Sequence, residues 1–98
     1  MKKDAPNAEE KVRAIKEQIV ALGPMRPGKL SVQYHKPIEK AQAFYQISYT
    51  IQKRSRSDYV READLERVKA ELENYQTFKR LCEELVVASL ALAKSRRR

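Results

Sequence analysis

The most constraining feature of the chain is its C-terminal third. From Glu62 onward, more than thirty residues pass without a Gly or a Pro. These two residues are the strongest helix breakers, so their absence over this length favours one continuous helix. Acidic residues at Glu62, Asp64 and Glu66 stand where the positive end of a helix dipole favours negative charge. We therefore predict a single long helix over residues 62–95.

An apolar stripe follows this predicted helix along its length. At 1.5 Å per residue an unbroken helix would reach roughly 50 Å, which is more than a small sheet can cover. Part of the stripe must therefore meet a second helix, and the stretch LVVASLALA is wide enough to meet a second chain. A kink that folds the helix back is the alternative. The stripe consists of Leu65, Val68, Leu72, Tyr75, Phe78, Leu81, Cys82, Leu85, Val86 and Leu92.

A shorter amphipathic helix is predicted near the N-terminus, over residues 8–22. Asn7 can cap it together with Glu10 three residues later, in a variant of the capping box. Gly23 in the left-handed conformation, followed by Pro24, would end it. Its apolar face is formed by residues spaced three and four apart, namely Ala8, Val12, Ile15, Ile19 and Leu22.

The segment between the two helices alternates in the manner of β-strands. A first short strand is indicated by Leu30, Val32 and Tyr34. The alternation is stronger over residues 42–51, where successive side chains would point to opposite faces of a sheet. One face would carry Tyr45, Ile47, Tyr49 and Ile51, and the other Phe44, Gln46, Ser48 and Thr50.

A polar turn over residues 52–55, without Gly or Asn, separates this strand from a return strand over residues 56–60. The return strand would place Ser57 and Tyr59 on one face. The prediction for residues 29–60 is a small antiparallel sheet of two or three strands. The whole chain is predicted to be one α+β domain, residues 1–98, with an N-terminal helix, the sheet and a long C-terminal helix.

Composition places the chain among ordinary folded proteins. It has 98 residues, of which 42% are hydrophobic and 35% charged, and it contains two Gly and four Pro. No apolar run reaches the roughly eighteen residues of a membrane span, and the N-terminus lacks the apolar region of a signal peptide. We expect a cytoplasmic protein without a membrane role. Cys82, the only cysteine, is expected to act as a small buried hydrophobe.

Charge gives the strongest functional signal. The net charge is +8, and residues 25–61 contain eight Lys or Arg against two acids. Four of the five tyrosines lie in the same segment. A sheet that combines cations and aromatic residues in this way is typical of nucleic-acid binding. A solvated hairpin end, whose charges serve only solubility, is the alternative.

A basic hairpin has specific uses on nucleic acid. Its cations displace counterions from phosphates, and a two-stranded ribbon is narrow enough to enter a major groove. Arg54 and Arg56 could each bond guanine with a bidentate fork, and Gln46 could contact a base directly or through water. Double-stranded DNA is therefore favoured over RNA. The candidate nucleic-acid-binding residues are Arg26, Lys29, Lys36, Gln46, Lys53, Arg54, Arg56 and Arg61.

Catalysis is not expected from this inventory. The only histidine, His35, lies in a basic loop without a neighbouring acid, so it makes a poor general base. Tyr45, Tyr49 and Tyr59 lack activating groups and are interpreted as core and cross-strand packing residues. Glu66, Glu73 and Glu84 are interpreted as solvated helix residues rather than metal ligands. We predict a protein that is not an enzyme and that has no metal or other cofactor.

The chain resembles a family of small uncharacterised archaeal and bacterial proteins that is commonly encountered near transposase genes. The resemblance covers roughly residues 10–93 and is carried by the segments MRPGKLSVQY, AFYQISYT, KRSRSDYV and ELENYQTFKRLCEELV. Many relatives carry a Cys-rich CGxxxCxC insert after the first strand, which is similar to a metal site. In this chain the corresponding loop, residues 35–40, has no cysteine. The resemblance implies an association with a mobile element and one of its proteins.

Two functional hypotheses follow. In the first, the chain is a homodimer that places two basic hairpins on a two-fold DNA site, and it would then be associated with the nucleoid. In the second, it is a protein-interaction or assembly module whose long helix binds a larger partner, without a role on nucleic acid. In both, the expected interface residues lie on the long helix, namely Phe78, Leu81, Leu85, Val86 and Leu92.

Overall fold

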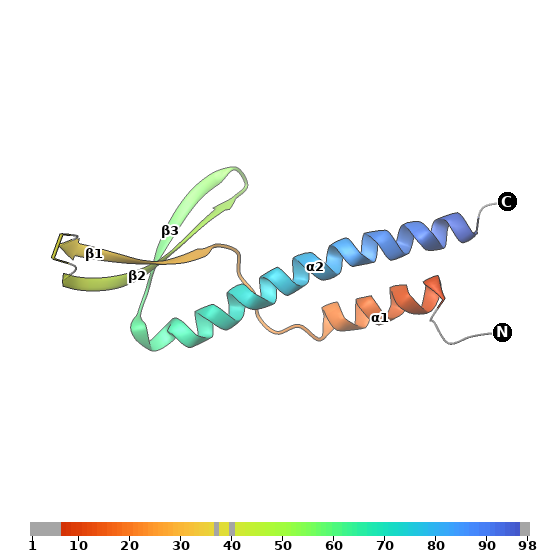
Figure 1. The fold of residues 1–98 in the computed structure, drawn as a ribbon, viewed down its shortest axis with the longest axis horizontal. Coiled ribbons are helices and arrows are strands. Elements are labelled where there is room, and N and C mark those ends of the chain that lie inside the picture. Colours follow the sequence, from red (N-terminus) through yellow and green to blue (C-terminus); the bar gives the residue numbers. More distant parts are fainter. Residues whose placement is uncertain (1–6, 37, 40, 97–98) are drawn as a thin grey trace. The chain divides into compact units, whose positions relative to one another are not determined.

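The structure is a computed structural model that describes residues 7–36, 38–39 and 41–96. Two α-helices, α1 (Ala8–Val20) and α2 (Leu65–Ser95), enclose three strands in the sequence (Figure 1). The strands are β1 (Lys29–Lys36), β2 (Ala41–Ile51) and β3 (Arg54–Val60), and a short 3₁₀ helix, η1 (Glu62–Asp64), precedes α2. The predicted α+β class and element order are confirmed, and the sheet has three strands.

The residues group into two compact units. The sheet unit comprises Pro24–Tyr75, and the helical unit combines Met1–Gly23 with Gln76–Arg98. Helix α2 therefore contributes residues 65–75 to the sheet unit and its remaining turns to the helical unit. The prediction of a single domain stays a prediction.

Strand β2 is the centre of the antiparallel sheet, in the order β1-β2-β3. It pairs with β1 as far as Ser48, which lies opposite Lys29, and with β3 from Tyr45 to Ile51. The last part of β2 therefore pairs with β3 alone. The end of the β2–β3 hairpin is a two-stranded ribbon that extends past the edge of β1 (Figure 1).

The turn of this hairpin is tighter than predicted. Ile51 pairs directly with Arg54, so only Gln52 and Lys53 form the loop. Both have positive φ, 50° and 66°, as in a type I′ turn, whose twist matches that of the flanking strands. The predicted turn over residues 52–55 is therefore wrong at Arg54 and Ser55, which belong to β3. A two-residue turn was not expected here because the Asn-Gly pair that favours it is absent.

One face of the sheet carries the core of the sheet unit. Residues paired directly across an antiparallel sheet share a face, so Tyr45 and Ile47 of β2 lie beside Val60 and Leu30. Ile47 is fully buried, and α2 packs on this face through Leu65, Val68 and Leu72. We call this the core face. The other face, the open face, carries the alternate residues of each strand.

The connection from α1 to β1 is fixed at several points within the sheet unit. The side-chain amide of Asn74 donates a hydrogen bond to the Pro24 carbonyl (2.8 Å), and the Arg26 N–H donates to the Glu71 carbonyl (3.2 Å). Gly28 has a φ of +130°, where L side chains are strained. A Cβ on Gly28 would also lie 2.8 Å from the Ser48 carbonyl oxygen. The chain therefore passes β2 closely enough to require a glycine.

Helix α1 begins as predicted. The Asn7 side chain accepts a hydrogen bond from the Glu10 N–H (2.8 Å), and the Glu10 carboxylate accepts one from the Asn7 N–H (3.4 Å), which completes the capping box. The helix ends at Val20, two residues earlier than predicted, and Gly23 does not have the predicted left-handed conformation. A bond from the Leu22 N–H to the Ile19 carbonyl tightens the last turn and replaces a glycine cap.

The core of the helical unit lies between α1 and the second part of α2, which run side by side (Figure 1). Ile15 of α1 is buried with Leu81 and Ala88 of α2. The expectation that part of the long stripe meets the first helix is therefore confirmed. Cys82 is half-buried rather than buried.

Helix α2 extends over Leu65–Ser95 as one α-helix, so the alternative of a break is not observed. Its predicted first turn is instead the 3₁₀ helix η1, after Arg61. Neither helix in the described part of the chain has an apolar stretch sufficient to cross a bilayer.

Candidate nucleic-acid interface

The predicted nucleic-acid-binding cations differ in whether they have an acidic partner. Arg26 and Arg61 form ion pairs with Asp58 and Asp64, each at 3.1 Å. Three further cations lie at the hairpin end, and their exposed side chains form no ion pair with a described residue. We call these three residues, Lys53, Arg54 and Arg56, the tip cations.

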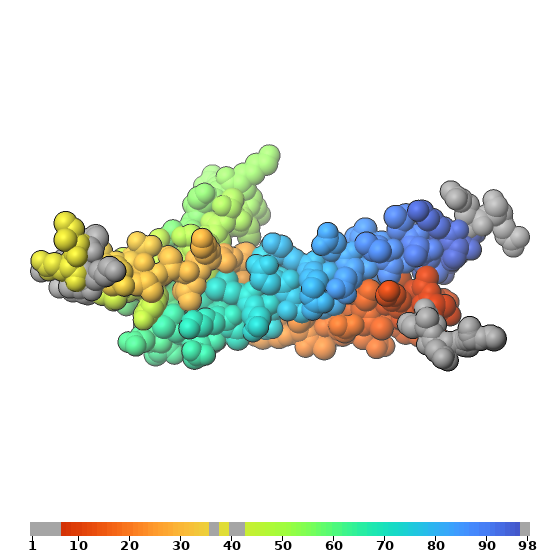
Figure 2. Space-filling view, viewed as in Figure 1, coloured from red at the N-terminus to blue at the C-terminus, as the bar shows by residue number. Residues whose placement is uncertain are grey.

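The tip cations lie at the part of the hairpin that has only two strands. Lys53 is in the turn, while Arg54 pairs with Ile51 and Arg56 with Tyr49. These pairings place both arginines on the same side of the ribbon, beyond the buried part of the core face. In the space-filling view the hairpin end is a narrow green projection from the sheet (Figure 2). Three cations are therefore concentrated on a ribbon about two strands wide.

Arg26 belongs to a polar cluster beside the ribbon. Its Nη2 lies 3.1 Å from Asp58 Oδ2, and the Tyr49 hydroxyl donates to the same oxygen at 3.0 Å. The Arg26 guanidinium also lies over the Tyr49 ring, 5.8 Å from its centroid. The hydrogen bond to Asp58 raises the pKa of Tyr49, because ionised tyrosine could not donate it. Arg26 thus connects the linker, which is the segment between α1 and β1, to the hairpin. The charge pattern alone could not distinguish this role from phosphate binding.

Arg61 is engaged at the start of α2. Its Nε donates to Asp64 Oδ2, and Arg67 approaches the other oxygen of Asp64 at 3.4 Å and Glu71 at 3.1 Å. The hydrogen bond from Arg61 lowers the pKa of Asp64, and Asp64 in turn raises the pKa of Arg67. The Arg61 guanidinium is therefore paired with a carboxylate at the start of α2 and is not a free cation for phosphate binding.

The remaining predicted residues lie elsewhere on the sheet. Lys29 pairs with Ser48, which places it on the open face, and Gln46 shares that face. Lys36 is the last residue of β1, and its side chain lies outside the described part of the chain. The other seven residues of the predicted set are therefore divided between the tip, the open face and two internal ion pairs.

The open face also carries an aromatic row that the sequence interpretation did not identify. His35 of β1 stacks on Phe44 of β2, with ring centroids 4.6 Å apart, and Tyr59 of β3 lies 6.3 Å beyond Phe44. Tyr59 packs across the strands on Phe44, as the interpretation of it as a core and cross-strand packing residue expects, but at 68% exposed it is not a core residue. Period-two counting puts Tyr59 on the face of Phe44 with either the predicted four-residue turn or the observed two-residue turn. Only the observed register makes the two rings neighbours, because it pairs Tyr59 with Gln46 rather than with Ser48.

The predicted interface residues on α2 are mostly engaged within the chain. Leu81 is 2% exposed and Leu85 packs against the same cluster as Ile15. Phe78 and Leu92 are half-buried, which leaves Val86 exposed. A second chain that contacts this part of α2 would therefore meet Val86 and its exposed neighbours Val87 and Leu90.

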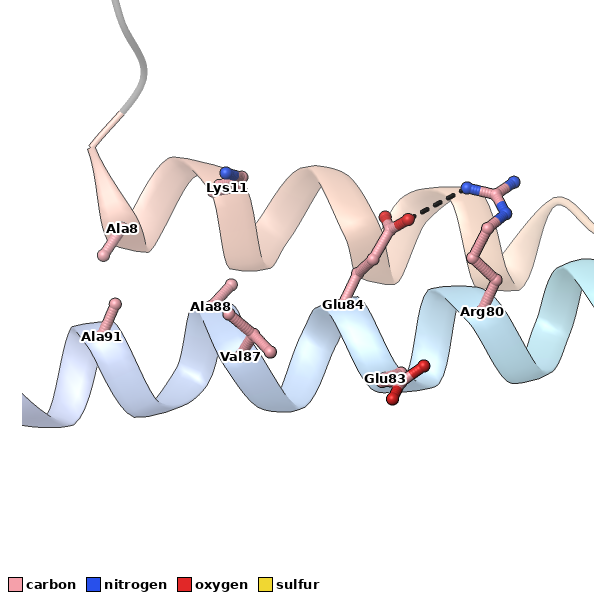
Figure 3. A pocket seen from close by; sticks show the side chains of 8 residues that line it. All are labelled: Ala8, Lys11, Arg80, Glu83, Glu84, Val87, Ala88 and Ala91. Atoms are coloured by element: carbon pink, nitrogen blue, oxygen red, sulfur yellow. Dashed lines mark hydrogen bonds and ion pairs between the residues drawn. The ribbon is translucent and has the colours of Figure 1, made fainter.

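A shallow groove of about 530 Å³, lined in part by Val87, lies between α1 and α2 of the helical unit (Figure 3). Its floor is formed by small apolar side chains such as Ala88 and Ala91, and an ion pair between Arg80 and Glu84 (3.0 Å) lies at one end. The full lining consists of Ala8, Lys11, Arg80, Glu83, Glu84, Val87, Ala88 and Ala91.

Within the described residues, no group of three or more His, Cys, Asp or Glu side chains could hold a metal ion. No protein-family model, curated protein or solved structure matches the chain.

Proposed function

We propose that the chain is a non-catalytic nucleic-acid-binding protein that contacts phosphates with the tip cations Lys53, Arg54 and Arg56. The observation that supports this most directly is the contrast in pairing. Arg26, Arg61 and other arginines are neutralised by acids, whereas the tip cations are exposed without an ion pair to a described residue. Cations on a two-stranded ribbon suit the major groove of duplex DNA.

A salt titration tests this proposal. Binding of a labelled random duplex, followed by anisotropy, should weaken steeply between about 50 mM and about 200 mM salt. Replacing all three tip cations by Ala should weaken binding, and the slope of log K against log salt should fall by about one for each phosphate that the variant no longer neutralises. Absence of binding at low salt would exclude the proposal.

A matched control removes three charges from another exposed surface. Substitution of Lys11, Arg13 and Lys16 on α1 by Ala changes the net charge by the same amount. If binding depends on the tip, this control should retain most of the salt slope. An equal loss in both triple variants would show that net charge alone attracts the nucleic acid.

A second candidate function is supported by the exposed apolar residues of α2. Val87 is 65% exposed beside the groove of the helical unit, and Val86 and Leu90 are also exposed. Exposed apolar residues that gather on one part of a surface are typical of protein interfaces. In this candidate, α2 binds a larger protein or a second copy of the chain, and substitution of the tip cations leaves that complex intact.

The process in which the protein acts is proposed from the family resemblance alone. A mobile-element setting would place the gene beside a transposase or recombinase gene, whose product would be the expected protein partner. Inspection of the neighbouring genes tests this part of the proposal.

A further inference from the structure

We propose that the open face of the sheet binds single-stranded nucleic acid, with unpaired bases stacked on the aromatic row His35, Phe44 and Tyr59. This inference rests on the proposed function for the phosphate contacts of the tip, and it adds a second ligand class and a separate site. The described residues of this face are Lys29, Ser31, Gln33, His35, Phe44, Gln46, Ser48, Thr50, Ser55, Ser57 and Tyr59.

The aromatic row crosses all three strands. His35 and Phe44 are stacked with an angle of 30° between their planes, and Phe44 and Tyr59 are tilted by 36°. Cross-strand contacts of this kind stabilise a sheet, which accounts for the meeting of His35 and Phe44. They do not require the ring of Tyr59 to be 68% exposed at the end of the row. An exposed ring next to a partly exposed one offers a surface on which a flat ligand can stack.

The row is not part of the hydrophobic core. Ile47, Val60 and Val68, which are buried, belong to the opposite side of the sheet together with their surrounding residues. No residue of α2 that contributes to this core approaches from the open face, since α2 packs on the core face. The aromatic residues are therefore available to a ligand within the sheet unit.

Polar groups around the row can bond a base or a sugar. The Ser48 and Ser57 hydroxyls lie 3.4 Å apart across β2 and β3. The Gln33 side-chain amide donates to the Ser31 hydroxyl (3.1 Å), which leaves the second N–H and the carbonyl of Gln33 for other partners. Gln46 is half-buried beside Tyr59. Amides and hydroxyls of this kind can contact base edges without adding charge.

The charge of the open face is complementary to a phosphate backbone. Among its described residues are a lysine, Lys29, and no Asp or Glu. The one carboxylate of β3, Asp58, pairs with Ile47 and thus lies on the core face, where Arg26 neutralises it. Arg54 and Arg56 lie on the other side of the ribbon, since they pair with Ile51 and Tyr49, so Lys29 is the described cation that a strand on the open face would meet. An acidic backbone therefore meets no repulsion from the described residues of this face.

Stacking requires bases that are unpaired. In a duplex the faces of the bases are covered by their neighbours, so a protein ring has no base face to contact. Exposed aromatic residues on sheets stack the bases of single strands in several nucleic-acid-binding folds, and such stacking tolerates many sequences. The open face is thus suited to single-stranded DNA or RNA, whereas the ribbon is suited to a duplex.

Substitutions at Tyr59 test the platform without disturbing the core. Tyr59→Leu removes the ring and retains an apolar side chain, while Tyr59→Phe retains the ring. Tyr34→Leu makes the same change on the core face, because Tyr34 shares the face of Ala43 and not that of Phe44. Each variant of the full chain is titrated with single-stranded DNA, single-stranded RNA and duplex DNA of about 16 nucleotides or base pairs, a length that spans one sheet.

The expected result is a loss that is specific to the ring and to single strands. Tyr59→Leu should weaken binding of a single strand by about tenfold and leave binding of the duplex unchanged. Tyr59→Phe and Tyr34→Leu should bind single strands like the native chain. Equal single-strand affinity in Tyr59→Leu and Tyr59→Phe would overturn the inference, as would an equal loss on single strands and duplex.

The tip variant separates this inference from the proposed function. If the platform is wrong and the tip is right, the triple variant loses affinity for both ligands and Tyr59→Leu changes neither. If the tip is wrong and the platform is right, binding of single strands survives in the triple variant and still depends on Tyr59. No binding of either ligand by the native chain at low salt excludes both.

Discussion

Gly28 and the two turn residues show how strongly single backbone positions determine this sheet. Gly28 has a positive φ and lies against β2, where a side chain would meet both the Ser48 carbonyl and the side chain of Ile47. Gln52 and Lys53 have positive φ although neither is Gly or Asn. The hairpin register therefore holds Gln52 and Lys53 at positive φ, and the close passage of the linker past β2 holds Gly28 there.

Replacement of Gly28 should unfold the sheet unit at lower denaturant. In Gly28→Ala the methyl group would lie 2.8 Å from the Ser48 carbonyl oxygen and 2.9 Å from Ile47 Cγ1. Backbone strain alone costs about 1–3 kcal/mol, and the displaced neighbours add to it. All five tyrosines lie within residues 24–75, so tyrosine fluorescence during urea unfolding reports on this unit.

The control is Gly23→Ala. Gly23 does not have a positive φ in the structure, so Ala should change the unfolding free energy by less than about 1 kcal/mol. Equal midpoints for Gly28→Ala and the native chain would show that the linker can move away from β2.

Among the elements, the start of α2 depends on charge more than on a cap. Arg61 occupies the N-cap position of η1 and makes no side-chain capping bond. Asp64 instead accepts from Arg61 and approaches Arg67, and both contacts favour its ionised form. A carboxylate in the first turn also interacts favourably with the helix dipole. The element therefore begins with an ionic network where α1 begins with a capping box.

This network predicts an acid-sensitive stability contribution. The pKa of Asp64 is lowered in the folded chain, so the folded state binds fewer protons than the unfolded state near that pKa. The contribution is present above the unfolded pKa of about 3.9 and is lost as the pH falls through the lower folded value. Asp64→Asn should therefore show a smaller stability loss on acidification than the native chain, measured by thermal unfolding from about pH 6 to about pH 2.

Glu66→Gln is the control for this prediction, because it removes one negative charge from the same helix start. Glu66 is almost fully exposed, and its ion pair with Lys69 is long, at 3.9 Å. Glu66→Gln should change the acid dependence of thermal stability less than Asp64→Asn does. Identical acid dependence in the native chain and in Asp64→Asn would contradict a role for the Arg61 contact.

For the whole molecule, the main consequence is that each unit has its own core. Ile47, Val60 and Val68 are buried in the sheet unit, and Ile15, Leu81 and Ala88 in the helical unit. Both cores are small, as expected for a chain of 98 residues. The exposed apolar residues Val86, Val87 and Leu90 remain outside both.

A second copy of the chain is the expected occupant of this exposed surface. The groove carries Lys11 and Arg80 together with Glu83 and Glu84, so its charges are complementary to those of an identical groove. Arg80 and Glu84 already pair with each other, so in a two-fold dimer Glu83 is the acid that can meet Lys11 of the other copy. Val87→Glu combined with Leu90→Glu should convert a dimer to a monomer in sedimentation equilibrium.

Val20→Glu on α1, which places one such charge on an exposed apolar position of the other helix, is the control for this pair. Val20 is 85% exposed and should tolerate the charge without a change of mass. Leu85 is unsuitable for this test, since it packs against the cluster that contains Ile15 of α1 and its substitution would disturb the helical unit itself. A native chain that sediments as a monomer at high concentration would contradict the dimer.

The sequence determined those features that depend on local preference and periodicity. The capping residues Asn7 and Glu10, the alternation of β2 and the long stretch free of Gly and Pro each specify an element through its own backbone chemistry. The two helices, the strands and the concentration of charge at the hairpin were accordingly predictable. The boundaries were less so, as Val20 and Arg54 show, because periodicity does not specify which short-range hydrogen bonds end a helix or close a turn.

Only the tertiary structure decided which of the cations and aromatic residues share a surface. From the sequence, Asp58 could pair with any nearby arginine. It pairs with Arg26 because the segment between α1 and β1 brings Arg26 next to β3. The two-residue turn placed Tyr59 opposite Gln46 and thereby beside Phe44. A shift of one residue would have placed Tyr59 on the core face. The register therefore separates the tip cations from the aromatic row, because each step along a strand reverses the face to which a side chain points.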